Sequence, residues 1–363
     1  MENKLASSLL RAGRFENAKE VIIEHGRQGS IIKINNGLDQ ESFRMSQAGL
    51  AELKSQLKRL FGLDERDLAI GKRAKIRLGK NLVSACLSAV NSGEGEKIRI
   101  EFLSEKPEVR PLSRLGLDSQ GQKLFSRALL RPGLIVISGL AGEGSSTTAY
   151  SLLAHLAGHD KAVAALESFP ELTIDGVSHL TKDNRKLSEQ LRRLKRSDQD
   201  AIFIADANQK ELLSGLELAK EGHLVIVETK AEGTKPIISA LGLEKKTKQN
   251  WPEITISWQR LVNNNCRHCA KRYRVNAREL ANIFPGINTE VGQDDVSALF
   301  SAGCPRCSYR GYTKRLAAFE LASFDPRPTP PLLKLRPLMV DVFRKFTAGT
   351  TSAKEAARLN QSL

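Results

Sequence analysis

Aromatic residues and long apolar runs are both scarce in this chain of 363 residues. Phe, Tyr and Trp together make up 5% of it, and only two residues are Trp. Platforms that stack the bases of single-stranded nucleic acid depend on such rings, so this mode of binding is disfavoured. No stretch approaches the roughly 18–20 apolar residues of a membrane-spanning helix, and residues 1–11 lack the profile of a signal peptide. We therefore expect a cytoplasmic protein.

Acidic residues are few relative to basic ones. There are 41 Asp and Glu against 56 Lys and Arg, so the formal net charge is +15. Such a charge favours an anionic partner, for example nucleic acid, an acidic membrane surface or nucleotide phosphates. A solvated basic surface without a specific partner is the alternative. Hydrophobic residues, at 40%, are enough for real cores, and the length predicts two or three domains.

Cysteine is also rare, and four of the five cysteines form two C-x-x-C pairs. Cys86 stands alone in an apolar–polar alternation, which predicts a small core residue. The two pairs predict a tetrahedral zinc site with four thiolate ligands, Cys266, Cys269, Cys304 and Cys307, and His268 is then expected on the surface. The interval between the pairs is longer than in common zinc ribbons, so we expect a helical excursion at residues 277–300. Four buried free thiols are the alternative.

One stretch predicts a strand, a glycine-rich turn and a helix in immediate succession. Residues 134–137 are apolar, and a helical pattern starts at Ser145. This is the context of a P-loop, in which backbone N–H groups and a helix N-terminus face a phosphate. The P-loop motif is matched except at its lysine, where Ser145 stands. The candidate nucleotide-binding residues are Gly139, Gly142, Gly144, Ser145, Ser146 and Thr147. A glycine turn without a ligand is the alternative.

The segment around this turn alternates between helices and strands, whereas the first hundred residues do not. There, helices are expected at 3–12 and 46–61 and strands at 20–24, 30–34, 74–78, 81–90 and 97–102, which indicates a small α+β domain. Residues 105–112 are typical of a linker. Beyond them, helices are expected at 119–130, 145–157, 183–195, 209–221 and 233–242, and strands at 134–138, 162–166, 201–205 and 223–228. This alternation predicts an α/β domain with a mostly parallel sheet.

Acidic residues follow three of these strands, at the ends where α/β domains hold their chemistry. Glu167 ends the second strand, Asp206 follows the third, and Glu228 lies with Lys230 near the end of the fourth. The catalytic candidates are Glu167 and Asp206, the latter in the position of a Walker B acid. An acid at the end of a strand is common, so it is their order after a P-loop that supports the assignment.

The order of these segments resembles the assembly ATPases of type II secretion systems and type IV pili. The similarity runs from about Glu20 to Leu321 and includes residues 95–97, 115–117, 131–139, 191–192, 196–200, 222–225 and 259–262. The family also carries a tetracysteine module, followed by a Gly-Tyr and a Glu-Leu that match Gly311-Tyr312 and Glu320-Leu321. The resemblance implies ATP with Mg²⁺ as ligand and a structural zinc ion. It also implies a domain order of an α+β domain (1–111), a RecA-like P-loop core (112–262), a tetracysteine zinc module (263–325) and a helical tail (326–363).

The departures from this family fall on its catalytic positions. Ser145 replaces the P-loop lysine, and Glu143 replaces a small residue within the loop. The family's paired acids become Glu167-Ser168, and its Walker B glutamate becomes Asp206. A histidine becomes Lys230, and two arginines become Asn208 and Glu101. Phosphoryl transfer depends on positioning and charge neutralisation, so these losses together should reduce the rate by orders of magnitude.

Three functional hypotheses follow. The favoured one is a degenerate member of the family that hydrolyses little or no ATP and serves as a structural or regulatory subunit of a secretion or pilus machine. Its partner would be an intact ATPase paralogue or the cytoplasmic face of an inner-membrane platform, in a homo- or hetero-hexamer peripheral to that membrane. The second is a slow but active ATPase that uses another cation. The third is a basic, zinc-containing nucleic-acid binder, whose binding would be salt-sensitive.

Overall fold

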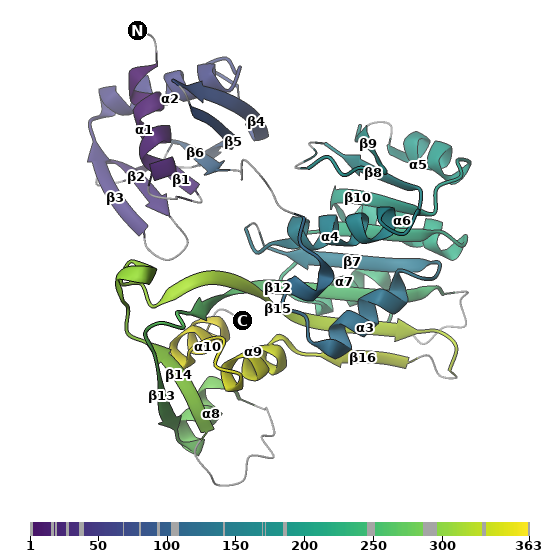
Figure 1. Cartoon of the computed structure of the whole chain (residues 1–363). Coiled ribbons are helices and arrows are strands. Elements are labelled where there is room, and N and C mark those ends of the chain that lie inside the picture. The colour runs from purple at the N-terminus through teal and green to yellow at the C-terminus, as the bar shows by residue number, and fades with distance from the viewer. Residues whose placement is uncertain are drawn as a thin grey trace. The chain divides into compact units, whose positions relative to one another are not determined.

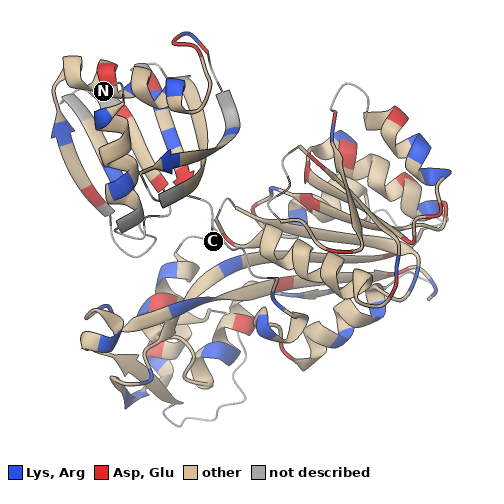
Figure 2. Ribbon diagram, turned by 45° about the horizontal axis from the view of Figure 1, so that its top comes forward, with Lys and Arg blue, Asp and Glu red and all other residues tan. Residues whose placement is uncertain are grey.

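The structure is a computed structural model in which two compact units, Met1–Glu108 and Val109–Leu363, follow one another along the chain (Figure 1). It describes residues 3–15, 18, 20–26, 29–35, 40–67, 69–79, 81–92, 95–102, 109–140, 142–168, 170, 172–183, 187–244, 251–285, 296–328 and 332–361. The boundary falls within the predicted linker, whose residues 105–108 lie outside this set. In the described residues, no helix is both long and apolar enough to cross a membrane. Lys and Arg are distributed over both units (Figure 2).

The first unit is a six-stranded antiparallel sheet with two helices. The strand order is β3-β2-β1-β6-β5-β4. Apolar residues of both helices, such as Leu10 and Leu53, share one core with the strands, and Cys86 is buried, as predicted. The elements are α1 (Lys4–Phe15), β1 (Glu20–Gly26), β2 (Gly29–Asn35), β3 (Gln40–Met45), α2 (Gln47–Leu60), β4 (Ala69–Leu78), β5 (Asn81–Ser92) and β6 (Gly95–Phe102). The predicted α+β class is confirmed, although β3, a mostly exposed edge strand, was not predicted.

The second unit is built on an eight-stranded sheet in the order β16-β15-β12-β7-β11-β10-β8-β9. The pairs from β12 through β9 are parallel, and β15 and β16 add antiparallel strands at one edge. The strands are β7 (Gly133–Gly139), β8 (Val163–Glu167), β9 (Val177–Thr181), β10 (Ala201–Ala207), β11 (Leu224–Thr229), β12 (Glu253–Asn265), β15 (Tyr312–Asp325) and β16 (Leu332–Arg336). The predicted α/β class with a mostly parallel sheet is confirmed.

Helices cover both faces of this sheet. Leu134 and Val136 of β7 enter one core with the later helices, whereas Ile135 and Ile137 enter a second core with the earlier ones. This alternation is what a parallel strand buried on both faces requires. The core that contains Ile135 and Ile137 is covered by η1 (Leu112–Arg114), α3 (Ser119–Ala128) and α4 (Ser145–Ala157). The core that contains Leu134 and Val136 is covered by α5 (Leu187–Lys195), α6 (Gln209–Lys220) and α7 (Lys235–Leu241).

The remaining elements surround the far ends of β12 and β15. Trp258 and Val262 of β12 share a third core with Leu280, Phe346 and Leu359 from three helices. These elements are β13 (Ala270–Val275), α8 (Ala277–Ile283), β14 (Val296–Ser301), η2 (Pro305–Cys307), α9 (Leu338–Thr347) and α10 (Ala353–Asn360). All of them belong to the same compact unit as the sheet, so the finer division at residues 262 and 325 stays a prediction.

Two helix predictions in this region are wrong. Residues 332–336, within the expected helical tail, form β16 instead, because Arg336 precedes Pro337 and is therefore biased to extended backbone, and because the edge of β15 offers a partner. The expected helical excursion at residues 277–300 is helical only in α8. Residues 296–301 form β14, which pairs with β13, and residues 286–295 lie outside the described set.

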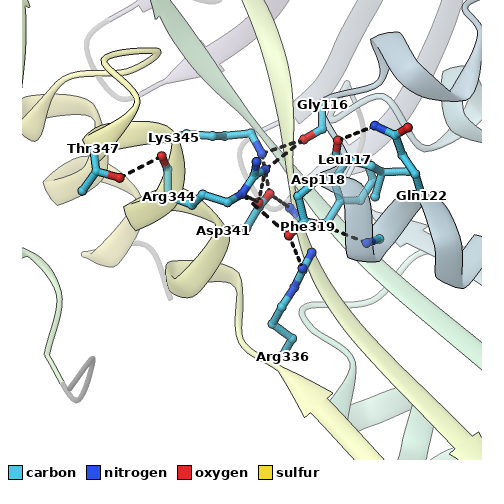
Figure 3. Close-up of polar contacts among 11 residues, drawn as sticks. Gly116, Leu117, Asp118, Gln122, Phe319, Arg336, Asp341, Arg344, Lys345 and Thr347 are labelled. Atoms are coloured by element: carbon cyan, nitrogen blue, oxygen red, sulfur yellow. Dashed lines mark hydrogen bonds and ion pairs between the residues drawn. The ribbon is translucent and has the colours of Figure 1, made fainter. Parts of the chain in front are cut away.

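A network of buried charges joins α9 to the start of this unit (Figure 3). The carboxylate of Asp341, 1% exposed, accepts hydrogen bonds from Lys345 at 2.5 Å, Arg344 at 2.6 Å and the Phe319 N–H at 3.0 Å. Lys345 also donates to the carbonyl oxygen of Gly116 at 2.8 Å. Burial lowers the pKa of Lys345, and the Asp341 charge opposes that change. One carboxylate therefore ties α9 to β15 and to the turn before α3.

A second carboxylate in the same region binds α3 to β16. The Asp118 side chain caps α3 by accepting the Gly121 N–H at 2.8 Å, and it accepts a hydrogen bond from Arg336 at 2.6 Å. Burial raises the pKa of Asp118, but the Arg336 and Gly121 hydrogen bonds outweigh it and hold the pKa below its usual value. Asp341 thus holds α9 on β15, and Asp118 holds α3 on β16.

Replacing Asp341 by Asn should destabilise the second unit by about 3 kcal/mol, because Lys345 then stays buried without its counterion. Asp325→Asn is the matched control, since its partner Arg327 is half exposed and such pairs contribute less than about 1 kcal/mol. Urea unfolding followed by Trp fluorescence reports this unit, which contains both Trp251 and Trp258. Equal losses in the two variants would contradict the assigned role of Asp341.

Candidate functional site

The glycine-rich turn has the strand–loop–helix geometry that the sequence predicts. β7 ends at Gly139, and α4 begins at Ser145. Gly142 and Gly144 adopt φ values of +78° and +84°, a left-handed conformation that glycine enters without strain. The first N–H groups of a helix have no partners within it, so the start of α4 offers donors and a positive dipole end. The backbone cradle for an anion is therefore present.

The hydroxyl residues at the start of α4 are held by neighbouring strands. Ser146 Oγ donates to Glu228 Oε1 of β11 at 2.9 Å, and Thr148 Oγ1 donates to Gln259 Oε1 of β12 at 2.8 Å. Both strands flank β7 in the sheet. Sequence analysis placed Glu228 at a strand end but left it out of the candidate site. The strand order shows why it belongs there: β11 lies directly beside the loop, whereas the strand of Asp206 is one further away.

The additional acid of the loop, Glu143, is bound by β12. Its Oε2 accepts a short hydrogen bond from the Leu261 N–H, and its Oε1 lies 3.5 Å from Arg260 Nε. Its carbonyl oxygen accepts a hydrogen bond from Gln259 Nε2 at 2.7 Å. β7 pairs with β12 only as far as Gln259, so the Leu261 N–H lies beyond the end of β7. Glu143 therefore accepts the hydrogen bond that a longer β7 would have accepted. The positive charge of Arg260 offsets the charge of Glu143.

Arg260 is a cation beside the loop that the sequence did not point to as part of the site. It is 8% exposed, and its guanidinium carbon lies 5.9 Å from the centre of the Trp258 ring. Among the described residues, Glu143 is its one ion-pair partner. Only the register of β12 against β7 places Arg260 beside the loop. That register depends on pairing between distant segments and cannot be inferred from the residues around Arg260.

Glu167, the first catalytic candidate, is enclosed by protein groups. It is 2% exposed, its Oε2 accepts a short hydrogen bond from the Tyr150 hydroxyl, and its Oε1 lies 2.8 Å from His179 Nδ1. Because His179 Nε2 accepts the Ile174 N–H at 3.1 Å, a neutral ring carries its proton on Nδ1 and donates it to Glu167. Both carboxylate oxygens are thus engaged away from the loop.

Asp206, the second candidate, ends β10 in an unusual backbone conformation. Its φ is +46°, and its side chain, 59% exposed, lies 3.3 Å from Lys230 Nζ. The buried Lys182 holds this turn, since its Nζ donates to the carbonyl oxygens of Ala205 at 2.8 Å and Asp206 at 3.2 Å, and to Glu211 at 2.9 Å. The structure does not bring Asp206 and Glu167 into contact with the loop's hydroxyl residues. Their catalytic roles stay predictions.

The four predicted cysteine ligands converge. All four Sγ atoms lie within 4.8 Å of one another, and three separations are 3.8 Å (Cys304–Cys307), 3.9 Å (Cys266–Cys304) and 4.0 Å (Cys269–Cys307). Four thiolates at about 2.3 Å from a tetrahedral zinc ion lie about 3.8 Å apart. The side chains therefore fit a metal ion of this kind, and His268 is exposed, as predicted.

The turns around the cysteines supply donors to the sulfurs. Cys307 Sγ accepts the N–H groups of Cys304 at 3.1 Å and Gly311 at 3.3 Å. Burial raises the pKa of the Cys307 thiol, but these hydrogen bonds lower it to about 6, whereas burial raises the pKa of Cys269 to about 11. Gly311 adopts φ +77°, and a Cβ there would lie 2.4 Å from the Ser301 carbonyl oxygen. Glycine is thus required beside the cluster.

Comparison with known proteins shows which family this chain resembles. The model of the family described as "Type II/IV secretion system protein" matches residues 14–336. The type II secretion system ATPase E of Vibrio cholerae is 25% identical over 333 residues, covering 89% of this chain and 65% of that protein. The type IV pilus assembly ATPase PilB of Myxococcus xanthus is 27% identical, covering 88% of this chain and 58% of that protein.

A solved structure shares the fold at lower identity. The ATPase DotB of Legionella pneumophila superposes with a TM-score of 0.61 at 16% identity, covering 100% of this chain and 97% of that one. The chain belongs to the type II/IV secretion system protein family, as the resemblance in its sequence indicated. It spans 58–65% of the length of the two curated relatives above.

Purified protein should contain about one zinc ion per chain, because the four sulfurs match tetrahedral thiolate coordination. Cys304→Ser should lose the metal and much of the stability of the second unit, since metal binding energy is folding energy. Cys86→Ser, in the other unit, is the control and should keep the metal. Elemental analysis measures the metal content, and metal-free protein prepared without chelators would refute the prediction.

Proposed function

We propose that this chain is a degenerate member of its family that hydrolyses little or no ATP. It would act as a structural or regulatory subunit of a type II secretion or type IV pilus machine. The observation that carries the proposal is the loop itself. The lysine position is Ser145, and Arg260, a cation beside the loop, is paired with the loop's own Glu143. A transferred phosphoryl group would find no free cation at this place in the described residues.

The other catalytic positions support the same conclusion. Catalysis of phosphoryl transfer is almost entirely positioning and charge stabilisation. Glu167 is sealed between Tyr150 and His179, and Asp206 is paired with Lys230 at the surface. The partners that the structure gives these two carboxylates lie outside the loop. In contrast, the sheet, the final helices and the four-cysteine cluster are well connected, and their contacts maintain the fold.

A chain that keeps its shape and loses its catalytic groups is suited to assembly. We propose as partner an intact ATPase paralogue or the cytoplasmic face of an inner-membrane platform, with the chain in a homo- or hetero-hexamer peripheral to the membrane. The relatives named above are themselves called a secretion system ATPase and a pilus assembly ATPase. Zinc would be structural in this subunit. A net charge of +15 gives it a strong field toward acidic surfaces.

A slow ATPase is the second candidate, and one observation favours it. Ser146 and Glu228 lie 2.9 Å apart, and a hydroxyl beside a carboxylate at a P-loop suits Mg²⁺. Together with the N-terminus of α4, these groups would bind a nucleotide through its metal ion and backbone contacts. ATP and Mg²⁺ therefore stay possible ligands even where turnover is lost.

ATP turnover should be undetectable, or far below the roughly 1–10³ s⁻¹ usual for enzymes. Ser145→Lys should strengthen ATP binding more than turnover, because it restores one cation while the other substitutions remain. Coupled phosphate-release assays and calorimetric titration separate the two effects. A wild-type rate of about 1 s⁻¹ that Ser146→Ala abolishes would establish the slow ATPase instead.

The protein should form a stable complex with an intact ATPase of the same family or with a platform protein. Co-expression with the products of the neighbouring assembly genes, followed by pull-down and native mass spectrometry, measures this. A chain that stays alone with every one of these products, yet binds DNA or RNA tightly at physiological salt, would establish the nucleic-acid hypothesis in place of ours.

A further inference from the structure

A groove lies on the second unit at the side of the β13–β14 ribbon, away from the glycine-rich loop. Its cavity volume is about 720 Å³, and it is bounded by β13, β14, α8 and α10. A volume of this size can hold several side chains of a binding partner. None of its lining residues belongs to the four-cysteine cluster or to the loop. The functional proposal above leaves this groove without a role.

The floor of the groove is apolar. Ile283 of α8 and Ala353 of α10 are buried beneath it, and Ala357 lines it further along α10. Phe300 of β14 lines it too and is 47% exposed. A large aromatic side chain left half in water beside an apolar floor is a feature of interaction sites, where aromatic residues supply much of the binding energy.

The rim of the groove is basic. Lys271 and Arg272 of β13 and Lys354 of α10 line it, and all three are exposed. In the β13–β14 pairing, Lys271 is opposite Phe300, so a cation and the aromatic ring lie side by side. Glu279 is the single acid among the lining residues. The rim therefore carries an excess of positive charge around an apolar centre.

Some exposed cations elsewhere in the unit are paired with acids. Lys161 and Lys195 form ion pairs of 3.0 Å and 2.8 Å with nearby acids. In contrast, Lys271, Arg272 and Lys354 form no ion pair within the part of the chain that the structure describes. Figure 2 shows Lys and Arg along the ribbon in this region. Uncompensated cations around an apolar groove complement a partner that is acidic at its edges and apolar at its centre.

We propose that this groove is a docking site for an acidic amphipathic segment of a partner protein. An apolar side chain of that segment would occupy the groove beside Phe300, and its carboxylates would meet Lys271, Arg272 and Lys354. As the occupant of this basic groove, a second copy of this chain, which also carries +15, is disfavoured relative to an acidic segment. A nucleic acid would pair its phosphates with the rim but would gain little from Ile283 and the alanines. The proposal goes beyond the proposed function, since it holds whether or not the chain hydrolyses ATP.

The experiment uses the full-length, metal-loaded chain and four fluorescein-labelled probes read by anisotropy at physiological salt. The first probe is an amphipathic helical peptide with a Leu face and a Glu face. The second replaces its Glu by Lys, the third replaces its Leu by Ala, and the fourth is single-stranded DNA. The protein variants are Phe300→Ala and the double variant Lys271→Glu with Lys354→Glu. Lys210→Glu, an exposed position on α6, is the charge control.

The proposal predicts that only the Leu/Glu peptide binds well. Its affinity should fall by about tenfold or more in both groove variants and stay unchanged in Lys210→Glu. Circular dichroism and metal content establish that each variant is folded. No binding of the Leu/Glu peptide, equal binding of the Ala/Glu peptide, or an equal loss in Lys210→Glu would overturn it. Tighter binding of DNA, lost in the same groove variants, would overturn it in favour of a nucleic-acid site.

Discussion

Strand β12 is the constraint on which the second unit depends. Along its first half it pairs with β7 on one side and with β15 on the other, in the middle of the sheet. Past Gln259, β7 ends and β12 continues, so its N–H groups on that side need other partners. Glu143 of the loop supplies one at Leu261, and Glu355 of α10 supplies another at Asn263, 3.1 Å away. The strand then leads directly to Cys266.

This arrangement places the loop, the final helices and the four-cysteine cluster on one strand. Asn265 N–H donates to Thr350 of the α9–α10 connection at 2.8 Å, and Cys266 N–H donates to Gly311 at 2.8 Å. One of the contacts that satisfy β12, the hydrogen bond from the Leu261 N–H to Glu143, thus also holds the loop. A glutamate that would repel a phosphate is here a structural group, because it completes the strand and pairs with Arg260.

Sequence reasoning identified the features that depend on local order. Neighbouring residues alone indicate the strand–turn–helix around Gly144, the two C-x-x-C pairs and the alternation of helices and strands in the α/β core. It did not identify features that depend on register between distant strands. Glu143 and Leu261 are 118 residues apart, and Ser146 meets Glu228 only because β11 lies beside β7. β16 was mistaken for helix because its edge pairing with β15 is not a local property.

The central claim of the proposal is that Glu143 stays bound to β12 and keeps Arg260 from acting as a free cation at the loop. Amide hydrogen exchange at Leu261, the N–H that Glu143 accepts, tests it most directly. The account predicts slow exchange in the wild-type protein, no change on addition of excess Mg-ATP, and faster exchange in Glu143→Ala. Acceleration at Leu261 by Mg-ATP, together with slower exchange at residues 145–147, would show that nucleotide displaces Glu143 and would contradict the account.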